Sequence, residues 1–180
     1  MDGDELAAAA RAAAAGDDIA FARIVRLTQV DVLRACSALV DPASAEDLAQ
    51  ETFLRAYRAL PTFTGASSLR TWLLAIARHV CMDDIRRRQR RRTLLRRLPP
   101  VAGTVSHGGL TELELLVARL PEGQREAFVL TQILDLSYDE AGQVMGCPLG
   151  TVRSRVARAR ATLVEQLHGD QRGTAGASSS

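Results

Sequence analysis

Residues 136–167 read LSYDEAGQVMGCPLGTVRSRVARARATLVEQL, which describes a short helix, a tight turn and a longer helix rich in arginine. Ser137 and Glu140 have the spacing of a capping box, in which each side chain satisfies a free amide at the helix start. Gly146 can adopt the positive φ that often ends a helix, and Pro148 suits the first turn of the next helix. We therefore predict a helix-turn-helix, a motif of many DNA-binding proteins.

The second of these helices has two chemically different faces. At about 100° per residue its apolar residues fall on one stripe, made of Val152, Val156, Ala159 and Leu163. The other side offers hydroxyl and guanidinium groups, which can bind base edges in the major groove or phosphates. A solvated polar face on an ordinary helix is the alternative interpretation. The candidate DNA-binding positions are Thr151, Arg153, Ser154, Ala157 and Arg158.

The composition favours helices and localises the charge. A chain of 180 residues suits one large domain or two small ones. Much of the 47% hydrophobic content is alanine and leucine, which favour helix. All 23 basic residues are arginines, yet the net charge is only +2, so the chain is not a general polycation. The arginines concentrate at residues 78–97 and 153–160, whereas Glu46, Asp47 and Glu51 form an acidic patch.

Apolar residues at helical spacing predict further helices. Residues 1–15 are acidic and then alanine-rich, which indicates a helix with little to bury. A long helix begins at Ser67 or Ser68 and becomes strongly basic at its far end. Ser44 and Asp47 have capping-box spacing at the start of another. The remaining helices are expected at residues 19–40, 44–60, 110–120 and 122–134.

Two irregular segments divide the chain. Residues 93–109 contain Pro99-Pro100 and several glycines without periodicity, which predicts a flexible linker. Residues 168–180 are rich in glycine and serine, which predicts disorder. We expect an all-α fold of two small helical domains. The expected parts are an N-terminal extension (1–16), a first domain (17–92), the linker (93–109), a second domain (110–167) and the tail (168–180).

Several classes of protein are disfavoured. The three cysteines are odd in number and widely spaced, which favours buried reduced thiols and a cytoplasmic location. No apolar run approaches the ~18 residues of a membrane span, and the N-terminus lacks a secretory pattern. His79 and Cys81 have no matching second pair for a metal. Without a glycine-rich phosphate loop or a nucleophile–base pair, we expect neither catalysis nor a cofactor.

Two blocks of sequence together resemble the extracytoplasmic-function sigma factors of bacterial RNA polymerase, within the sigma-70 family. They are DLAQETFLRAYRAL with SLRTWLLAIARHV and DDIRRR, and LPEGQREAFVLTQILDLSYDEAGQVMGCPLGTVRSRVARAR. The resemblance covers nearly all of residues 17–167 and is closest to the sigma-C type of actinobacteria. It implies a sigma-2 domain followed by a sigma-4 domain, which bind core polymerase, recognise −10 and −35 promoter elements and help open the DNA.

The resemblance also implies roles for single residues. The segment DLAQETF is similar to the helix that docks on the clamp helices of the polymerase β′ subunit, which assigns polymerase binding to Asp47, Gln50, Glu51 and Phe53. An acidic solvated face is the alternative there. The helix that opens at Pro148 would read the −35 element, although some relatives carry a larger side chain at Ala157.

The loop from Phe63 to Ser68 and the helix after it resemble the part that melts and reads the −10 element. Extruded bases need a pocket, rings for stacking and arginines for phosphates. The candidates are Phe63, Arg70, Trp72, Arg78 and His79. Trp72 also lies on the apolar stripe of its helix, which favours a role in the core, and many relatives carry asparagine at the position of His79.

The expected partners are core RNA polymerase, through its β′ clamp helices and its β subunit, promoter DNA, and an anti-sigma factor of the kind that many relatives have. A DNA-binding regulator that acts without polymerase is the first alternative, but it leaves the N-terminal domain unexplained. An enzyme is the second, and no motif supports it.

Overall fold

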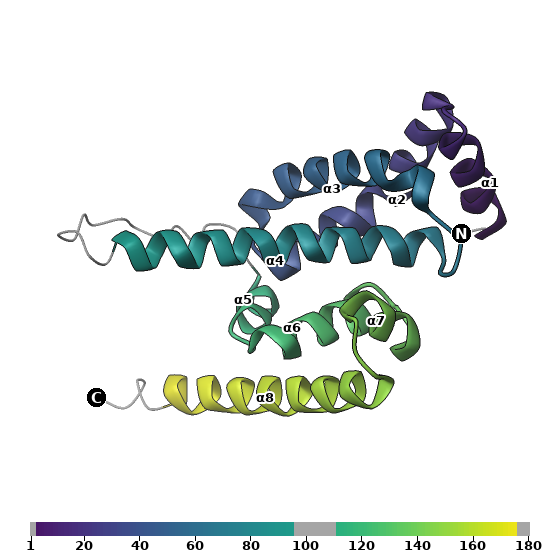
Figure 1. Ribbon diagram of the computed structural model, residues 1–180. Coiled ribbons are helices and arrows are strands. Elements are labelled where there is room, and N and C mark those ends of the chain that lie inside the picture. Colours follow the sequence, from purple (N-terminus) through teal and green to yellow (C-terminus); the bar gives the residue numbers. More distant parts are fainter. Residues whose placement is uncertain (1–2, 96–110, 176–180) are drawn as a thin grey trace. The chain divides into compact units, whose positions relative to one another are not determined.

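The structure is a computed structural model that describes residues 3–95 and 111–175, with side chains for residues 5–94 and 111–168 (Figure 1). Over these residues the chain forms helices and turns and no strand. It divides into two compact units, one that ends at residue 109 and one that begins at residue 110. The prediction of an all-α fold with two helical domains is therefore confirmed.

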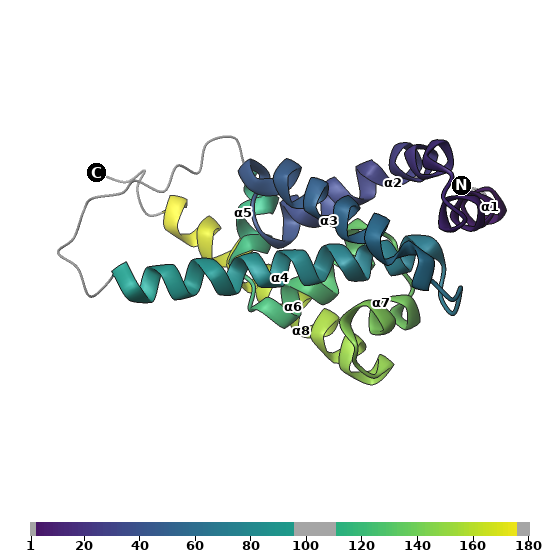
Figure 2. The same ribbon diagram turned by 45° about the horizontal axis from the view of Figure 1, so that its top comes forward.

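The first unit packs its described helices around one core. In Figures 1 and 2 the long helix α4 runs alongside α3, and α1 lies beside the start of α2. In chain order the elements are α1 (Gly3–Ala14), α2 (Asp18–Leu39), the 3-10 turn η1 (Pro42–Ser44), α3 (Ala45–Ala59), the 3-10 turn η2 (Leu60–Thr62) and α4 (Leu69–Leu95).

Aspartates begin two of these elements. The Asp17 carboxylate accepts hydrogen bonds from two backbone amides of α2, and Asp41 accepts one from the Ser44 amide at 2.9 Å. The predicted capping box of Ser44 with Asp47 is wrong, because Ser44 makes no side-chain capping bond to α3. Its hydroxyl accepts a hydrogen bond from Arg88 instead. The Ser44 side chain therefore makes a tertiary contact with α4 in place of the predicted cap of α3.

Helix α1 is part of the core of the first unit. Its Leu6, Ala9 and Ala10 are buried, so the expectation that residues 1–15 have little to bury is wrong. Alanine methyl groups let the helix approach its neighbours closely, and the burial of several of them adds to the hydrophobic stabilisation. The cluster they join also contains Ile24, Ala56, Leu60, Leu69 and Leu73.

The second unit is built on the long helix α8. Its elements are α5 (Glu112–Ala118), α6 (Glu122–Phe128), a π-helical turn η3 (Val129–Ile133), α7 (Tyr138–Met145) and α8 (Leu149–Ala175). The helix expected over residues 122–134 thus changes to π geometry at Val129. Asp135 follows with a positive φ of 53°, which turns the chain towards α7.

Two long helices continue further than the sequence indicated. Helix α4 includes residues 93–95, which were expected in the linker, and residues 96–109 lie outside the described part of the chain. Helix α8 continues to Ala175, so the expected disorder is wrong for residues 168–175, while residues 176–180 are not described. No proline follows Pro148, so no residue after it lacks the backbone amide that continues a helix.

The turn between α7 and α8 matches its sequence signals. The capping box of Ser137 and Glu140 is present, and Gly146 ends α7 with a φ of 63°, as predicted. The sequence analysis missed Gly142. A Cβ atom on that residue would lie 2.9 Å from the carbonyl oxygen of Cys147, so the turn backbone can cross α7 only over a glycine. These two glycines set the angle at which α8 leaves the turn.

Gly142→Ala should lower the free energy of unfolding by about 1–3 kcal/mol, because the added methyl group overlaps backbone that cannot move aside. Gly150→Ala is the matched control, since a Cβ there meets no atom within 4 Å and alanine favours helix. Urea unfolding of the full chain, followed by circular dichroism, measures both. Equal effects of the two substitutions would contradict the role given to Gly142.

Candidate nucleic-acid and polymerase interfaces

Helix α8 buries one side and exposes the other. Val152, Val156, Ala159 and Leu163 are all buried, which confirms the predicted stripe. On the opposite side Arg153, Ala157 and Arg158 are exposed, and Thr151 and Ser154 are half-buried. We call these five residues the arginine face of α8.

The arginines of α8 differ in what they contact. The Arg155 guanidinium lies against α6, where a Cβ on Gly123 would be 3.2 Å from its Cζ atom. Arg160 donates a hydrogen bond of 2.7 Å to Gln132 in η3. Within the described residues, Arg153 and Arg158 make no hydrogen bond or ion pair inside the protein. Those two guanidinium groups are therefore free to bind an external group.

Helix α3 presents a mixed polar and apolar face. Its buried side consists of Ala45, Leu48, Ala49, Thr52 and Ala56. On the other side Asp47 and Gln50 are exposed and Glu51 is half-buried. Leu54 lies among them, one turn after Gln50, and is 53% exposed. We call Asp47, Gln50, Glu51 and Leu54 the outer face of α3, and Phe53 is half-buried at its edge.

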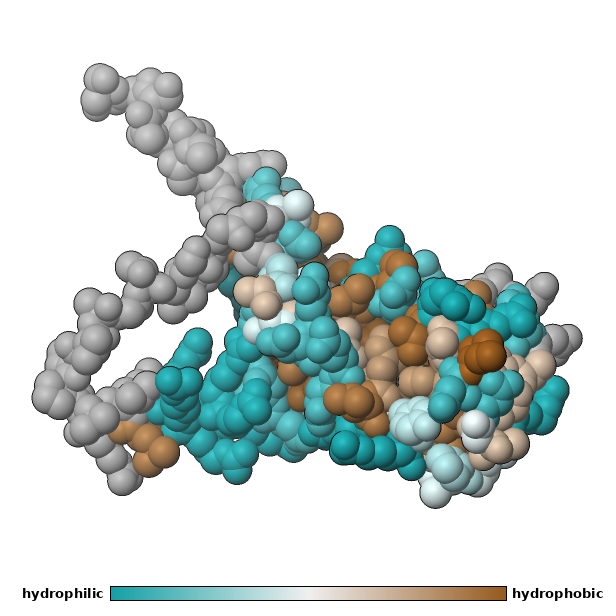
Figure 3. All heavy atoms as spheres, turned by 90° about the horizontal axis from the view of Figure 1, so that it is seen from above, coloured by the Kyte–Doolittle hydropathy of each residue, from teal (hydrophilic) through white to brown (hydrophobic). Residues whose placement is uncertain are grey.

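Leu54 is a residue that the sequence analysis missed. It lies outside the apolar stripe of α3, and an apolar residue off that stripe was the available signal. Figure 3 shows apolar side chains exposed among hydrophilic ones on the side of the first unit that looks upward in Figure 1, where α3 lies. The exposed Leu54 offers a partner apolar area next to the carboxylates and the amide of this face.

Charge pairs fix α4 against α3. Arg55 of α3 donates to Glu51 at 2.7 Å and to Asp83 of α4 at 3.0 Å. The hydrogen bond from Arg55 lowers the pKa of Asp83, and the positive charges of Arg55 and Arg86 lower it further. Glu51 is thus already paired within the chain, while Asp47 and Gln50 are more open to a partner.

Ion pairs hold the first part of the basic segment of α4. Arg88 pairs with Asp41 of the η1 turn and with the buried Asp84, each at 2.5 Å. Arg87 also contacts Asp84. Beyond this network the exposed arginines of α4 are Arg86, Arg90, Arg91 and Arg92. The arginine run therefore divides into side chains that hold α4 and side chains that face solvent.

The candidates for the −10 element fall into two groups. Phe63 and Trp72 pack together with ring centroids 5.1 Å apart, and both rest against the core. Arg70 is ion-paired with Asp31 at 2.6 Å. Arg78 and His79 lie further along α4, half-buried and exposed respectively, and do not border the cavity beside Phe63. The structure thus brings together only Phe63, Trp72 and Arg70.

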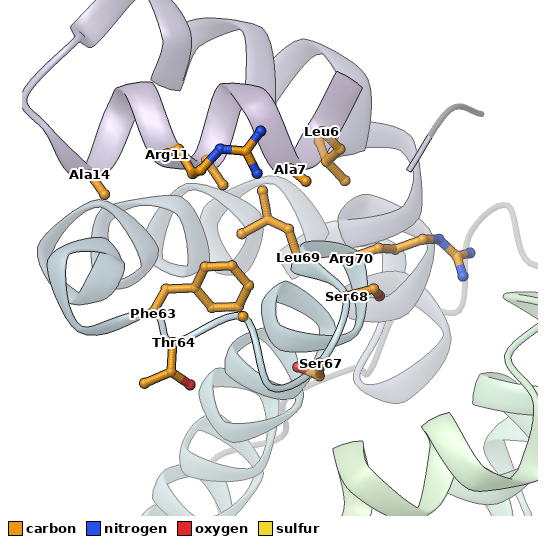
Figure 4. A pocket seen from close by; sticks show the side chains of 12 residues that line it. Leu6, Ala7, Arg11, Ala14, Phe63, Thr64, Ser67, Ser68, Leu69 and Arg70 are labelled. Carbon is orange, nitrogen blue, oxygen red and sulfur yellow. The ribbon is translucent and has the colours of Figure 1, made fainter. Parts of the chain in front are cut away.

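A cavity of ≈ 490 Å³ opens beside this group (Figure 4). One wall is the loop between η2 and α4, and Gly65 shapes that loop with a φ of 75°. The other wall is α1, which the sequence analysis did not connect with this site. The lining residues of the loop are Phe63, Thr64, Gly65, Ser67 and Ser68, and the first turn of α4 adds Leu69 and Arg70.

The cysteines are free thiols in different surroundings. Cys36 and Cys81 are fully buried, as expected, whereas Cys147 is half-buried in the α7–α8 turn. A hydrogen bond with Cys81 lowers the pKa of Cys36 despite the opposing effect of burial. In the described parts of the chain, no three His, Cys, Asp or Glu side chains gather in a way that could hold a metal ion. No described helix is long and apolar enough to cross a bilayer.

Comparisons with known proteins match both units. The family model for sigma-70 region 2 matches residues 24–91, and that for sigma-70 region 4 matches residues 110–163. The ECF RNA polymerase sigma factor SigC of Mycobacterium tuberculosis is 47% identical over 175 residues, which cover 94% of this chain and 95% of that protein. The chain belongs to the extracytoplasmic-function sigma factors. It acts in promoter recognition and transcription initiation by RNA polymerase.

More distant members of the family share the fold. The ECF RNA polymerase sigma-E factor of Escherichia coli is 35% identical over 169 residues, which cover 81% of this chain and 85% of that protein. The structure of CnrH in complex with the cytosolic domain of CnrY has a TM-score of 0.73 at 30% identity, and the match covers 94% of this chain and 99% of CnrH. The sigma factor RpoE of Bartonella quintana, solved with the anti-sigma factor NepR, has a TM-score of 0.70 at 30% identity, over 82% and 96% of the two chains.

The Arg88 network makes the stability of this sigma factor depend on pH. Burial raises the pKa of Asp41, but hydrogen bonds from Arg88 and Ser44 and the charge of Arg88 outweigh it and leave the pKa below its ordinary value. A carboxylate with a lowered pKa in the folded state stabilises the fold above its unfolded pKa of about 3.9. That contribution is lost as the pH falls through the folded pKa.

Asp41→Asn should therefore lower the free energy of unfolding at pH 7 by up to about 1 kcal/mol, the size of a partly exposed ion pair. The difference from the unmodified chain should shrink below about pH 4, where the aspartate becomes protonated. Urea unfolding at a series of pH values measures it. Glu46→Gln is the control, since Glu46 is an exposed carboxylate of α3 without an arginine partner among the described residues. A difference that stays constant down to pH 3 would contradict the pairing.

Proposed function

We propose that this sigma factor docks on core RNA polymerase through the outer face of α3 and reads two promoter elements. The arginine face of α8 would bind the −35 element, and the loop at residues 63–68 with the start of α4 would bind the −10 element and help to open it. The observation that carries the proposal is the pair of unpartnered guanidinium groups, Arg153 and Arg158, opposite the buried stripe of a helix-turn-helix.

The −35 assignment follows from the geometry of α8. The turn after Gly146 presents the first turns of α8 outward, and these are the turns that enter the major groove in helix-turn-helix proteins. Arg153 can form a bidentate contact with a guanine edge. The Ser154 hydroxyl donates to the Thr151 carbonyl oxygen at 3.0 Å, so it keeps its acceptor capacity for DNA. Ala157 adds only a methyl group, which suits contact with a thymine methyl or no contact at all.

Docking on polymerase follows from the mixed chemistry of α3. Asp47 and Gln50 can pair with arginines of a partner helix, and the exposed Leu54 supplies apolar area one turn further along α3. The half-buried Phe53 supports this surface from beneath. The clamp helices of the β′ subunit are the expected partner on this side, and the β subunit is the expected partner of the second unit.

The −10 assignment combines a ring, a cavity and positive charge. Phe63 borders a cavity large enough for a small ligand, and single-stranded DNA is held by stacking and by cations along its backbone. The exposed arginines at the far end of α4 would contact phosphates, and Arg78 and His79 would lie along the path between them. Trp72 supports Phe63 from the core side.

We further propose that the chain has no catalytic activity of its own, because RNA synthesis belongs to the polymerase, and that it works in the cytoplasm without a cofactor. We also propose an anti-sigma factor as a partner, because one solved relative is bound to the anti-sigma factor NepR and another to the cytosolic domain of CnrY. The outer face of α3 and the arginine face of α8 are the surfaces that such a partner would cover.

Arg153→Ala should weaken binding of the holoenzyme to a promoter by about 1–3 kcal/mol and relax discrimination at one position of the −35 element, because a bidentate base contact is lost. Affinities for promoters with single changes in the −35 element measure this. Arg160→Ala is the matched control on the same helix, since Arg160 is bound to Gln132. Unchanged discrimination with a smaller salt slope would show a phosphate contact instead.

Asp47→Ala with Gln50→Ala should abolish or strongly reduce binding to core polymerase, because it removes the two exposed polar groups of the proposed docking face that are open to a partner. Binding of the full chain to purified core enzyme, measured by fluorescence anisotropy, checks it. The control is Gln29→Ala, which removes an exposed amide from α2 in the same unit as α3. Full affinity of the α3 variant would place the docking surface elsewhere.

A further inference from the structure

Helix α1 carries a single arginine, and it borders the cavity beside the −10 loop. Besides the loop, the cavity is lined by Leu6, Ala7, Ala10, Arg11 and Ala14. Figure 4 shows Arg11 extending along α1, with its guanidinium above Leu69 and with Phe63 on the opposite side. Among the described residues, Arg11 forms no hydrogen bond or ion pair within the protein. It is an exposed cation at the mouth of a largely apolar cavity.

Arg70, the other arginine of this cavity, is engaged elsewhere. Its side chain points away from α1 in Figure 4 and is ion-paired with Asp31 at 2.6 Å. The Asp31 carboxylate offsets its charge and holds its guanidinium in place. An anionic group that enters between α1 and the loop would therefore meet Arg11 as the cation without a carboxylate partner.

The position of α1 is fixed at both ends. Near its start Glu5 accepts hydrogen bonds from Arg23 of α2 at 2.6 and 3.0 Å. At its end the amide of Asp17 donates to the Ala12 carbonyl oxygen at 3.2 Å, and Gly16 turns the chain into α2 with a φ of 97°. Between these points Leu6, Ala9 and Ala10 are buried in the core. Arg11 thus projects from a rigid support.

Small residues on α1 leave the space that the cavity occupies. Ala7, Ala10 and Ala14 follow at intervals of three and four, so their methyl groups lie on one side of the helix and face the loop. The opposite wall offers the Phe63 ring, and the rim offers the hydroxyls of Thr64, Ser67 and Ser68. An apolar slot with a ring, hydroxyls and one free cation has the chemistry of a site for a nucleotide: base inside, phosphate at the mouth.

We propose that α1 is the second wall of the pocket for an extruded base of the −10 element, and that Arg11 binds the phosphate next to that base. The proposal rests on the proposed reading of the −10 element by the loop at residues 63–68, and it adds a helix and a residue to that site. Helix α1 then takes a direct part in promoter opening. The site can hold the base and its phosphate only when the strand is single-stranded, and Arg11 therefore favours the open state.

The test uses holoenzyme made from the full chain and core polymerase, with a promoter that this holoenzyme selects from a random DNA pool. The probes are that promoter as a full duplex and as a fork whose non-template −10 strand is single-stranded. Arg11→Gln should weaken binding to the fork about tenfold, reduce its salt slope by about 0.7, and leave unchanged the binding to the duplex at a temperature low enough to keep that promoter closed. Arg11→Lys should retain most of the affinity. Ala7→Phe, which fills the slot from a half-buried position, should weaken fork binding as Arg11→Gln does.

Arg26→Gln is the matched control, because it removes an exposed arginine of α2 from the same unit. Circular dichroism of each variant establishes that it is folded. If Arg11→Gln binds the fork as tightly as the unmodified protein, or loses fork and duplex affinity equally, the inference is wrong. Phe63→Ala distinguishes the role of α1 from the role of the loop. If Phe63→Ala weakens fork binding and Arg11→Gln does not, only the role of α1 is wrong. If Phe63→Ala also leaves fork binding unchanged, the −10 assignment of the loop is wrong as well.

Discussion

The packing of α4 against α1, α2 and α3 is the constraint on which the first unit depends. Its buried side carries Leu69, Leu73, Leu74, Ala77 and Val80 into the core. Its polar side is joined to α3 by Arg55 and Asp83 and to η1 by Arg88 and Asp41. Because the loop at residues 63–68 leads directly into α4 and α3 packs against α4, displacement of α4 would disturb both this loop and the outer face of α3.

The arginines fall into two groups, those that position helices and those whose charge is available to a binding partner. Arg55, Arg88 and Arg155 are held by neighbouring groups and position helices, whereas Arg11, Arg153 and Arg158 project without a partner among the described residues. This separation explains how a chain with a net charge of only +2 can bind a polyanion. We propose that selectivity for promoter DNA comes from where the unpaired guanidinium groups lie, since general positive charge would favour any duplex.

Local signals predicted the parts of the fold that local interactions determine. The capping box at Ser137, the turn at Gly146 and the buried stripe of α8 were readable because caps, positive φ and helical spacing act within a few residues. Ser44 was misread because its competitor, Arg88, is 44 positions away. The role of α1 was missed for the same reason, since an alanine-rich helix shows its partner only in the fold. Leu54 could be recognised in the sequence as a leucine outside the apolar stripe of α3, but only the structure shows that it is exposed.

We propose that this chain programs core RNA polymerase by reading two separate promoter elements. In vitro transcription with purified chain, core enzyme and a promoter selected by the holoenzyme tests this proposal. Specific initiation should require the chain and should fall when either the −35 or the −10 element is scrambled. If the chain binds duplex DNA tightly by itself, yet supports no specific initiation from core enzyme on any selected promoter, it does not recruit polymerase to promoters in this way.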